Sequence, residues 1–421
     1  MNNVKKLLLI ATLAVSCMAP CVALAKQKDA PYDTQSQREA TRYSEWMVRS
    51  EMQRTPLSYY LDFTDPQKRP DGKWSYVMGI ELEGMLDTYL AYGDSAILRY
   101  VASYPEKMIA EDGKVTGYKL EDYNLDNVRT AHFLYRIQQL IPRTGNEKAL
   151  RTIFRQLEEQ PRTEDGVWWH KAIYAHQVWL DGIFMGLPFY CQAAGKIKSD
   201  EGDKAVHAIY DDAVDQIART FQRTYDARTG LWKHAWDETH SIFWANPETG
   251  LSQHTWARAL GWFTMAMVEV LDVLPRDYGR RSEVVEMLQQ TLRSVVRYQD
   301  RKTGVWHDVL DVKAKENYLE STASCMFAYC LLKGSRLGYL DKSFRKAGEK
   351  AYRGILRQFI RKNEDGTISL TQCCSVSGLG PANNTKRDGS FRYYMSEPIR
   401  DNDAKGIGPF IWASLEMERG K

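Results

Sequence analysis

Beyond its N-terminus, the sequence contains no apolar run of the ~18 residues that a membrane-spanning helix needs. It also has no CxxC pair, no HExxH motif and no EF-hand loop, which are the usual short signatures of metal sites. We therefore expect no membrane span beyond the N-terminus and no metal site. No linker rich in Pro or Ser divides the 421 residues, which favours one large domain.

Beyond residue 25, the chain also lacks an excess of charge of either sign. The remaining chain has 55 basic and 54 acidic residues, a net charge of +1. Such a balance offers no general attraction for nucleic acid or for an anionic membrane. An anionic substrate would have to be met by local cations.

Cysteine is scarce, and the number beyond residue 25 is odd. The five are Cys191, Cys325, Cys330, Cys373 and Cys374. Scattered in this way, they make a poor disulfide framework. The adjacent pair leaves metal or redox chemistry open, but buried apolar thiols with at most one bridge are favoured.

The N-terminus has the three parts of a secretory signal: Lys5 and Lys6, an apolar run, and the small-residue site Ala23-Leu24-Ala25. We expect residues 1–25 to be a signal peptide, 26–38 a mobile leader and 39–421 a single domain in the periplasm or outside the cell. A membrane anchor, or a lipoprotein attached through Cys17, is the alternative.

A Gly-containing turn recurs six times along the chain, mostly as Asp-Gly or Thr-Gly. In four of the six a Trp stands two residues after the Gly, and helical periodicity dominates between the turns. The six glycines are Gly72, Gly113, Gly166, Gly230, Gly304 and Gly366.

Two kinds of helix lie between these turns. Residues 177–190 and 256–275 are apolar nearly all round, whereas 127–141 and 283–299 are amphipathic. The pattern predicts an all-α (α/α)6 barrel of six helical hairpins with short strands or loops at its mouth. Buried helices would form the inner ring, amphipathic helices the outer ring, and the turns would gather at one mouth with the site residues. An irregular helical solenoid or two helical domains remain the alternatives.

Aromatic residues are abundant near these turns, among 12 Trp and 24 Tyr. Flat aromatic faces at a concave mouth suit the C–H faces of sugar rings, although any single Trp is equally explained by core packing. The set therefore points to a carbohydrate cleft.

Two acidic residues stand out from their surroundings. Asp181 lies among Trp179, Ile183, Phe184 and Met185, where a carboxylate is costly to bury without a partner or a task. Burial raises the pKa of such a group, which suits a proton donor at neutral pH; a core ion pair is the alternative. Asp126 begins an amphipathic helix and is either a second functional carboxylate or a helix N-cap.

A third group combines His234, after a Gly turn, with Arg258, near the start of an apolar helix. An unpaired guanidinium there would be costly. It either pairs with Asp181 in the core or clamps a substrate carboxylate through its two-pronged geometry.

At these residues the sequence resembles the unsaturated rhamnogalacturonyl hydrolases, glycoside hydrolase family 105, which are related to the unsaturated glucuronyl hydrolases of family 88. The resemblance covers roughly residues 40–418. It is carried by WWHKAIYAHQVWLDGIFMGLPFY, GLWKHAWDE, HTWARALGWFTMAMVEVL and the C-terminal segment DGSFRYYMSEPIRDNDAKGIGPFIWASLEME.

The resemblance implies an (α/α)6 barrel that acts on oligosaccharides bearing a 4,5-unsaturated uronic acid at the non-reducing end, with no cofactor. Asp181 matches the general acid of the family and Asp126 its second carboxylate. Positions that match sugar-contacting residues are Tyr76, Lys171, His234, Trp256 and Arg258. The chain departs from the family where Ala259-Leu260 follows Arg258 in place of the usual Gly-Asn pair.

Other functions on the same barrel remain open at this stage. The substrate could come from rhamnogalacturonan and other pectins or, for an unsaturated glucuronyl hydrolase, from other polysaccharides. A sugar epimerase would need a His pair, for which His234 and His307 are candidates, and a conventional inverting glycosidase is a further alternative. A non-catalytic sugar-binding protein would keep the Trp clusters but would have no reason to place Asp181 in an apolar helix.

Overall fold

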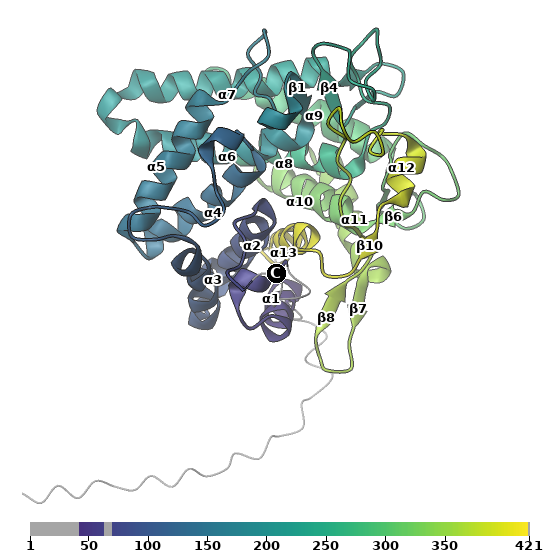
Figure 1. Ribbon diagram of the computed structural model, residues 1–421. Helices are drawn as coiled ribbons and strands as arrows, with labels where there is room; N and C mark the ends of the chain where they lie inside the picture. Colours follow the sequence, from purple (N-terminus) through teal and green to yellow (C-terminus); the bar gives the residue numbers. More distant parts are fainter. Residues whose placement is uncertain (1–41, 63–69, 420–421) are drawn as a thin grey trace, which may run out of the picture. The chain divides into compact units, whose positions relative to one another are not determined.

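The computed structural model describes residues 42–62 and 70–419, and these lie in one compact unit that runs from Arg42 to Lys421. Six helices form a closed inner ring in which each packs against the next and the last packs against the first (Figure 1). In ring order they are α2 (Tyr76–Tyr92), α4 (Asp126–Leu140), α6 (Leu180–Ile197), α8 (Ala257–Val273), α10 (Ser321–Arg336) and α13 (Ala404–Glu418). The predicted (α/α)6 barrel is confirmed.

Six further helices cover this ring from outside, each packed mainly on one inner helix. They are α1 (Tyr43–Arg54), α3 (Ser95–Met108), α5 (Thr144–Glu159), α7 (Asp203–Arg223), α9 (Arg281–Arg297) and α11 (Lys342–Gln358). The two rings differ as their burial requires: residues 257–271 of α8 are all buried, whereas α11 buries only one face. A short helix, α12 (Phe391–Ser396), lies outside this pattern.

The sixth hairpin is built from the two ends of the barrel domain. Outer helix α1 packs against α13, which comes last in the chain, and Figure 1 shows the two side by side. Glu418 of α13 accepts hydrogen bonds from the Ser44 backbone (3.1 Å) and from the Tyr92 hydroxyl (2.6 Å). A Cβ at Gly408 of α13 would lie 2.7 Å from the Ile80 carbonyl oxygen of α2, so only glycine permits this close approach. The ring is thereby closed.

The strands are short and stand in the loops as antiparallel pairs, five of them among the described residues. They are β1 (Gln177–Trp179) with β4 (Ala235–Asp237), β2 (Tyr225–Asp226) with β3 (Leu231–Trp232), β5 (Trp306–His307) with β6 (Leu319–Glu320), β7 (Ile360–Lys362) with β8 (Ile368–Leu370), and β9 (Cys373–Cys374) with β10 (Ile399–Arg400).

The six glycine turns lie at equivalent places, since each falls in the connection that leads into an inner helix. All six glycines have φ between 69° and 92°, a conformation that residues with a side chain rarely adopt. Because successive inner helices run the same way, the turns gather at one end of the barrel. The residues of functional interest, however, lie after the turns, in the first turns of the inner helices or in the segments that lead into them.

The division of helices by amphipathicity is wrong for α4. This helix was expected in the outer ring, yet it lies in the inner one. Its charged residues Arg129, His132 and Arg136 lie inside the barrel, at the end opposite the turns, where they pair with acidic residues. The polar face of this amphipathic helix is therefore covered by protein rather than by solvent. Glycine turns are thus a better guide to ring position than hydrophobic periodicity.

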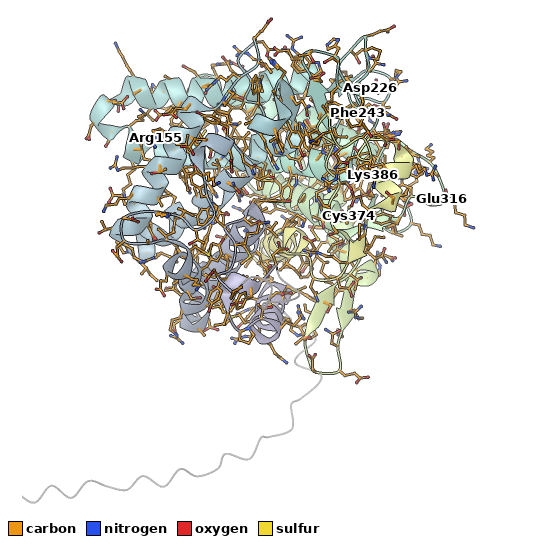
Figure 2. The ribbon with its side chains drawn as sticks, in the orientation of Figure 1. Arg155, Asp226, Phe243, Glu316, Cys374 and Lys386 are labelled. Atoms are coloured by element: carbon orange, nitrogen blue, oxygen red, sulfur yellow. The ribbon has the colours of Figure 1, made fainter. Side chains whose placement is uncertain are left out.

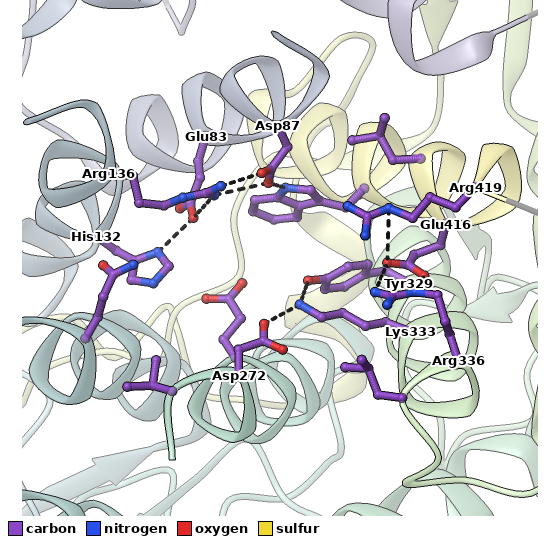
Figure 3. A pocket seen from close by; sticks show the side chains of 16 residues that line it. Glu83, Asp87, His132, Arg136, Asp272, Tyr329, Lys333, Arg336, Glu416 and Arg419 are labelled. Atoms are coloured by element: carbon purple, nitrogen blue, oxygen red, sulfur yellow. Dashed lines mark hydrogen bonds and ion pairs between the residues drawn. The ribbon is translucent and has the colours of Figure 1, made fainter. Parts of the chain in front are cut away.

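A network of ion pairs surrounds a cavity of about 460 Å³ at that opposite end, to which all six inner helices contribute (Figure 3). Arg129 is fully buried and pairs with Glu269 (2.7 Å) and with Glu83 (2.8 Å). Arg136 also reaches Glu83, at 2.8 Å, and Arg336 pairs with Glu416 at 2.6 Å. These pairs connect helices that are far apart in sequence and neutralise one another.

The five cysteines of the barrel are all free and buried. Among the described residues, no helix is long and apolar enough to cross a membrane. The expected signal peptide and leader lie outside the described residues.

Breaking the central ion pair should destabilise the barrel strongly. We expect Arg129→Met to lower the free energy of unfolding by ~3–5 kcal/mol, because it strands buried carboxylates on α2 and α8. Arg151→Met, which breaks an exposed pair with Glu147 within α5, should cost less than ~1 kcal/mol. Urea unfolding of both variants checks this, and equal losses would contradict a central role for the network.

Candidate active site

Asp181 lies in the first turn of α6, directly after strand β1. The helix begins at Leu180, so the expectation of one continuous helix from Gln177 is wrong: residues 177–179 form a strand paired with β4. The carboxylate of Asp181 is 14% exposed, and its Oδ2 lies 3.4 Å from Nε2 of His234. It therefore stands at the mouth, open to a ligand on one side and to His234 on the other.

His234 is completely buried and is held from its other nitrogen. Its Nδ1 lies 2.9 Å from the Tyr394 hydroxyl, and the backbone N–H of Leu180 donates to the His234 carbonyl at 3.1 Å. The pairing of β1 with β4 thus brings His234 against Asp181 although the two are 53 positions apart. Nε2 of His234 thus lies against the Asp181 carboxylate, although neither this nitrogen nor Oδ2 of Asp181 has a hydrogen-bond partner among the described residues.

Asp126 is the first residue of α4, and its carboxylate turns away from the helix. Oδ2 accepts from Lys171 Nζ at 2.5 Å, and Oδ1 lies 3.5 Å from Nε2 of His170. Burial alone raises the pKa of Asp126, but Lys171 and His170 outweigh it and bring that pKa below its ordinary value. Leu125 occupies the N-cap position, so the alternative of Asp126 as an N-cap is wrong.

The neighbouring His170 is almost completely buried. Burial, opposed only in part by Asp126, lowers the pKa of His170 to about 4. The ring is therefore neutral near pH 7. It stacks on Trp179 with 4.7 Å between centroids, and Tyr174 stacks on the same Trp at 4.6 Å. These rings form an aromatic wall beside Asp181.

Arg258 lies in the first turn of α8 and is 1% exposed. Its Nη1 donates to the Cys374 carbonyl at 2.5 Å and its Nη2 to the Ser375 carbonyl at 3.4 Å, while the guanidinium lies 4.4 Å from the Trp256 ring centroid. In the described part of the chain, no carboxylate lies within 4.0 Å of it. The core ion pair with Asp181 is therefore wrong, and Arg258 is a buried cation with no anion in contact.

Trp256 is fixed by a buried acid that the sequence pattern did not reveal. The indole N–H donates to Oδ1 of Asp308 at 3.0 Å, and the indole ring lies 5.0 Å from that of His234. Burial, with Glu320 nearby, raises the pKa of Asp308 to about 8. Asp308 thus holds a proton at neutral pH and anchors the ring as a neutral acid.

Tyr76 is the first residue of α2, and its surroundings place it among the other site residues. Desolvation raises the pKa of its hydroxyl far above the ordinary value, with contributions from Asp126 and Asp181 and an opposing one from Arg258. Tyr76, Asp126 and Lys171 also line a cavity of about 540 Å³ that includes Trp74. The seven residues expected from the sequence are thereby brought to one mouth.

Four of these seven residues occupy equivalent positions. Tyr76, Asp126, Asp181 and Arg258 are each the first or second residue of an inner helix. The N-terminal ends of α-helices carry partial positive charge, so this mouth favours anions although the chain as a whole is nearly neutral. Local backbone dipoles add to the cations Lys171 and Arg258.

Sequence reasoning missed His170, Tyr174, Tyr394 and Asp308. His170 could have been found, because it immediately precedes Lys171 in WWHK. Asp308 and Tyr394 carried no local signal, since their contacts with Trp256 and His234 span 52 and 160 positions.

His307, the second half of the proposed epimerase pair, lines a separate cavity of about 880 Å³ with Arg297 and Tyr298. Among the described residues, no three His, Cys, Asp or Glu side chains are grouped as ligands for a metal ion.

The raised pKa of Asp308 has a consequence for stability. An acid with a folded-state pKa near 8 and an unfolded pKa of ~4 makes the protein lose stability as pH rises between these values. Asp308→Asn removes this titration. The free energy of unfolding of the variant, relative to that of the wild type, should therefore rise by up to ~1.4 kcal/mol per pH unit between these two pKa values. Urea unfolding at pH 5 and pH 8 measures the difference, and a constant difference would contradict the assignment.

Comparison with known proteins agrees with this architecture. The model of Glycosyl Hydrolase Family 88 matches residues 43–421. A family 105 glycoside hydrolase from C. acetobutylicum is 37% identical, superposes with a TM-score of 0.82, and the match covers 90% of this chain and 100% of that one.

Two further relatives are more distant. The unsaturated rhamnogalacturonyl hydrolase YesR of Bacillus subtilis is 24% identical over 71% of this chain and 79% of its own length. The unsaturated glucuronyl hydrolase of Bacillus sp. GL1 is 14% identical with a TM-score of 0.61, over 89% and 97% of the two chains, and shows the shared fold alone. The family match spans nearly the whole barrel domain, and so the chain belongs to Glycosyl Hydrolase Family 88 and is a glycoside hydrolase.

Proposed function

We propose that this hydrolase removes a 4,5-unsaturated uronic acid from the non-reducing end of oligosaccharides left by polysaccharide lyases, of the rhamnogalacturonan or pectin type. The observation that carries the proposal is the pairing of Asp181, open at the mouth, with Arg258, a buried cation with no anion in contact. A uronic acid supplies the missing carboxylate, and its enol ether supplies the atom to be protonated. The similarity to YesR supports the choice of polysaccharide.

In this mechanism Asp181 donates its proton to C4 of the unsaturated ring. The C4–C5 double bond is consumed, and positive charge develops on C5 and the ring oxygen. A water molecule adds at C5 and returns a proton to the Asp181 carboxylate. The hemiketal then opens by breaking the bond between C5 and the ring oxygen, which leaves a ketone at C5 and a hemiacetal at C1. Collapse of this hemiacetal to an aldehyde breaks the glycosidic bond and releases the rest of the oligosaccharide as an alcohol, so that one water is consumed per bond broken.

The other residues have distinct tasks. His234, fixed by Tyr394, orients Asp181, and Arg258 binds the C5 carboxylate against the Trp256 ring. Asp126 stays ionised beside Lys171 and stabilises the developing cation. This division differs from a displacement at the anomeric carbon, in which two carboxyl groups act as acid and as nucleophile or base.

The other readings explain less of this geometry. An unsaturated glucuronyl hydrolase would use the same chemistry on another polysaccharide, and a panel of lyase products separates the two. The epimerase reading needs His307 beside His234, but His307 lines the separate cavity. A sugar-binding protein without activity gives no reason for a buried histidine that orients Asp181.

Asp181→Asn should remove nearly all activity while the fold survives. Asn keeps the shape but cannot deliver a proton, and general acid catalysis contributes ~10²–10⁴-fold. No lysine or arginine is paired with Asp181 in the described chain, so stability should change little. Turnover is followed by loss of the enol ether's ultraviolet absorbance, together with a melting curve on the same preparation.

Asp215→Asn on outer helix α7 serves as the matched control and should keep wild-type turnover. An Asp181→Asn variant that retained a tenth or more of the wild-type rate would rule out Asp181 as the acid.

We also propose that the protein is exported and that its mature chain begins near Lys26. The support is the charged, apolar and small-residue segments of residues 1–25. N-terminal sequencing of the protein made by its own host should find Lys26, and a lipidated Cys17 would contradict export as a free protein.

A further inference from the structure

A loop at the mouth, residues 375–389, joins strand β9 to helix α12 and is firmly held; Cys374 at its base and Lys386 within it are marked in Figure 2. Side chains from outside the loop bond to its carbonyl oxygens at four places. The donors are Arg258 to Ser375 at 3.4 Å, Tyr393 to Gly378 at 2.6 Å, Trp244 to Gly380 at 3.2 Å and Gln253 to Asp388 at 3.3 Å.

Arg387 is fixed within this loop through its backbone. The Gly380 N–H donates to the Arg387 carbonyl at 2.9 Å, and the Arg387 N–H donates to the Asn384 carbonyl at 3.4 Å. Its guanidinium, by contrast, makes no hydrogen bond or ion pair with any described residue, although the side chain is half-buried. A guanidinium has five N–H donors. Arg387 therefore combines a fixed position with donors that protein groups leave unused.

The guanidinium lies at the edge of the catalytic mouth. A Cβ at Gly378 would stand 3.1 Å from Arg387 Nη1 and 3.7 Å from Cζ3 of Trp179. Because Gly378 has no side chain, the Arg387 guanidinium can lie next to the edge of the Trp179 ring. Trp179 belongs to the aromatic wall and precedes Asp181 by two residues, and Leu379 of the loop packs in the same buried cluster.

Arg258 and Arg387 are thus two cations at the mouth that have no carboxylate within ion-pair distance among the described residues. Under the proposed function, on which this inference rests, the terminal unsaturated uronate has one anionic group, and Arg258 binds it. The second cation has no partner on that sugar. We propose that Arg387 binds an anionic group, a carboxylate or a sulfate, on the part of the oligosaccharide that is released, so that the preferred substrates are acidic beyond their terminal residue.

Three substrates that share the terminal unsaturated uronate test this assignment. The released part is neutral in the first, contains a saturated uronic acid in the second, and contains a sulfated sugar in the third. For each enzyme the measured quantity is kcat/KM on an acidic substrate divided by kcat/KM on the neutral one. The variants are Arg387→Gln, Arg387→Lys and, as the matched control, Lys386→Gln on the same loop.

We expect Arg387→Gln to lower this ratio by roughly 10- to 100-fold, which is the range for one charge-assisted hydrogen-bonded contact. Arg387→Lys should give an intermediate ratio because it keeps the charge but loses the planar fork. Lys386→Gln, whose side chain is exposed, should match the wild type. The acidic substrate whose ratio falls identifies the group as carboxylate or sulfate.

Two results would overturn the assignment. An Arg387→Gln variant that lost activity equally on all three substrates would show that Arg387 supports the fold or binds the terminal sugar. A variant that kept wild-type activity on all three would show that Arg387 binds no substrate anion. A wild-type enzyme inactive on all three substrates would instead refute the proposed function, and this inference with it.

Discussion

Closure of the inner ring between α13 and α2 is the constraint on which the site depends. Gly408 of α13 and Gly84 of α2 let these two helices, which come from opposite ends of the domain, approach at backbone distance. Once it is closed, the six inner helices point their N-terminal ends at one mouth. Tyr76, Asp126, Asp181 and Arg258 are far apart in sequence, yet each begins an inner helix and so reaches the same space. Loss of this closure would separate them.

The two ends of the barrel handle charge in opposite ways. At the end opposite the mouth, acids and bases such as Glu83, Arg129 and Glu269 pair with one another and hold the helices together. At the mouth, Arg258 bonds only to carbonyl oxygens and Asp181 meets only a histidine. The mouth also contains one close ion pair, Asp126 with Lys171, but Arg258 there has no carboxylate in contact among the described residues and is therefore available to a ligand. The arrangement explains how a chain with almost no net charge can recognise an acidic sugar.

Neutral groups support the charged ones at the mouth. Burial keeps His170 uncharged and Asp308 protonated near pH 7, so that Trp179 and Trp256 are held by groups that add no charge of their own. The field at the mouth is then set by Asp126, Asp181, Lys171 and Arg258 and by the helix ends. Uncharged supports of this kind allow the aromatic rings to be rigid without competing for the substrate carboxylate.

The sequence by itself determined the architecture and the main candidates, because both leave local signals. Six Gly turns with helical periods between them predicted the barrel, and a carboxylate in an apolar segment singled out Asp181. Only the tertiary structure decided what these residues contact. In the structure α4 lies in the inner ring, and Asp126 pairs with Lys171 instead of capping a helix. Asp181 contacts His234 and not Arg258. Such pairings depend on which helices become neighbours when the ring closes, and the pattern of the sequence does not show which residues 45 to 160 positions apart will meet.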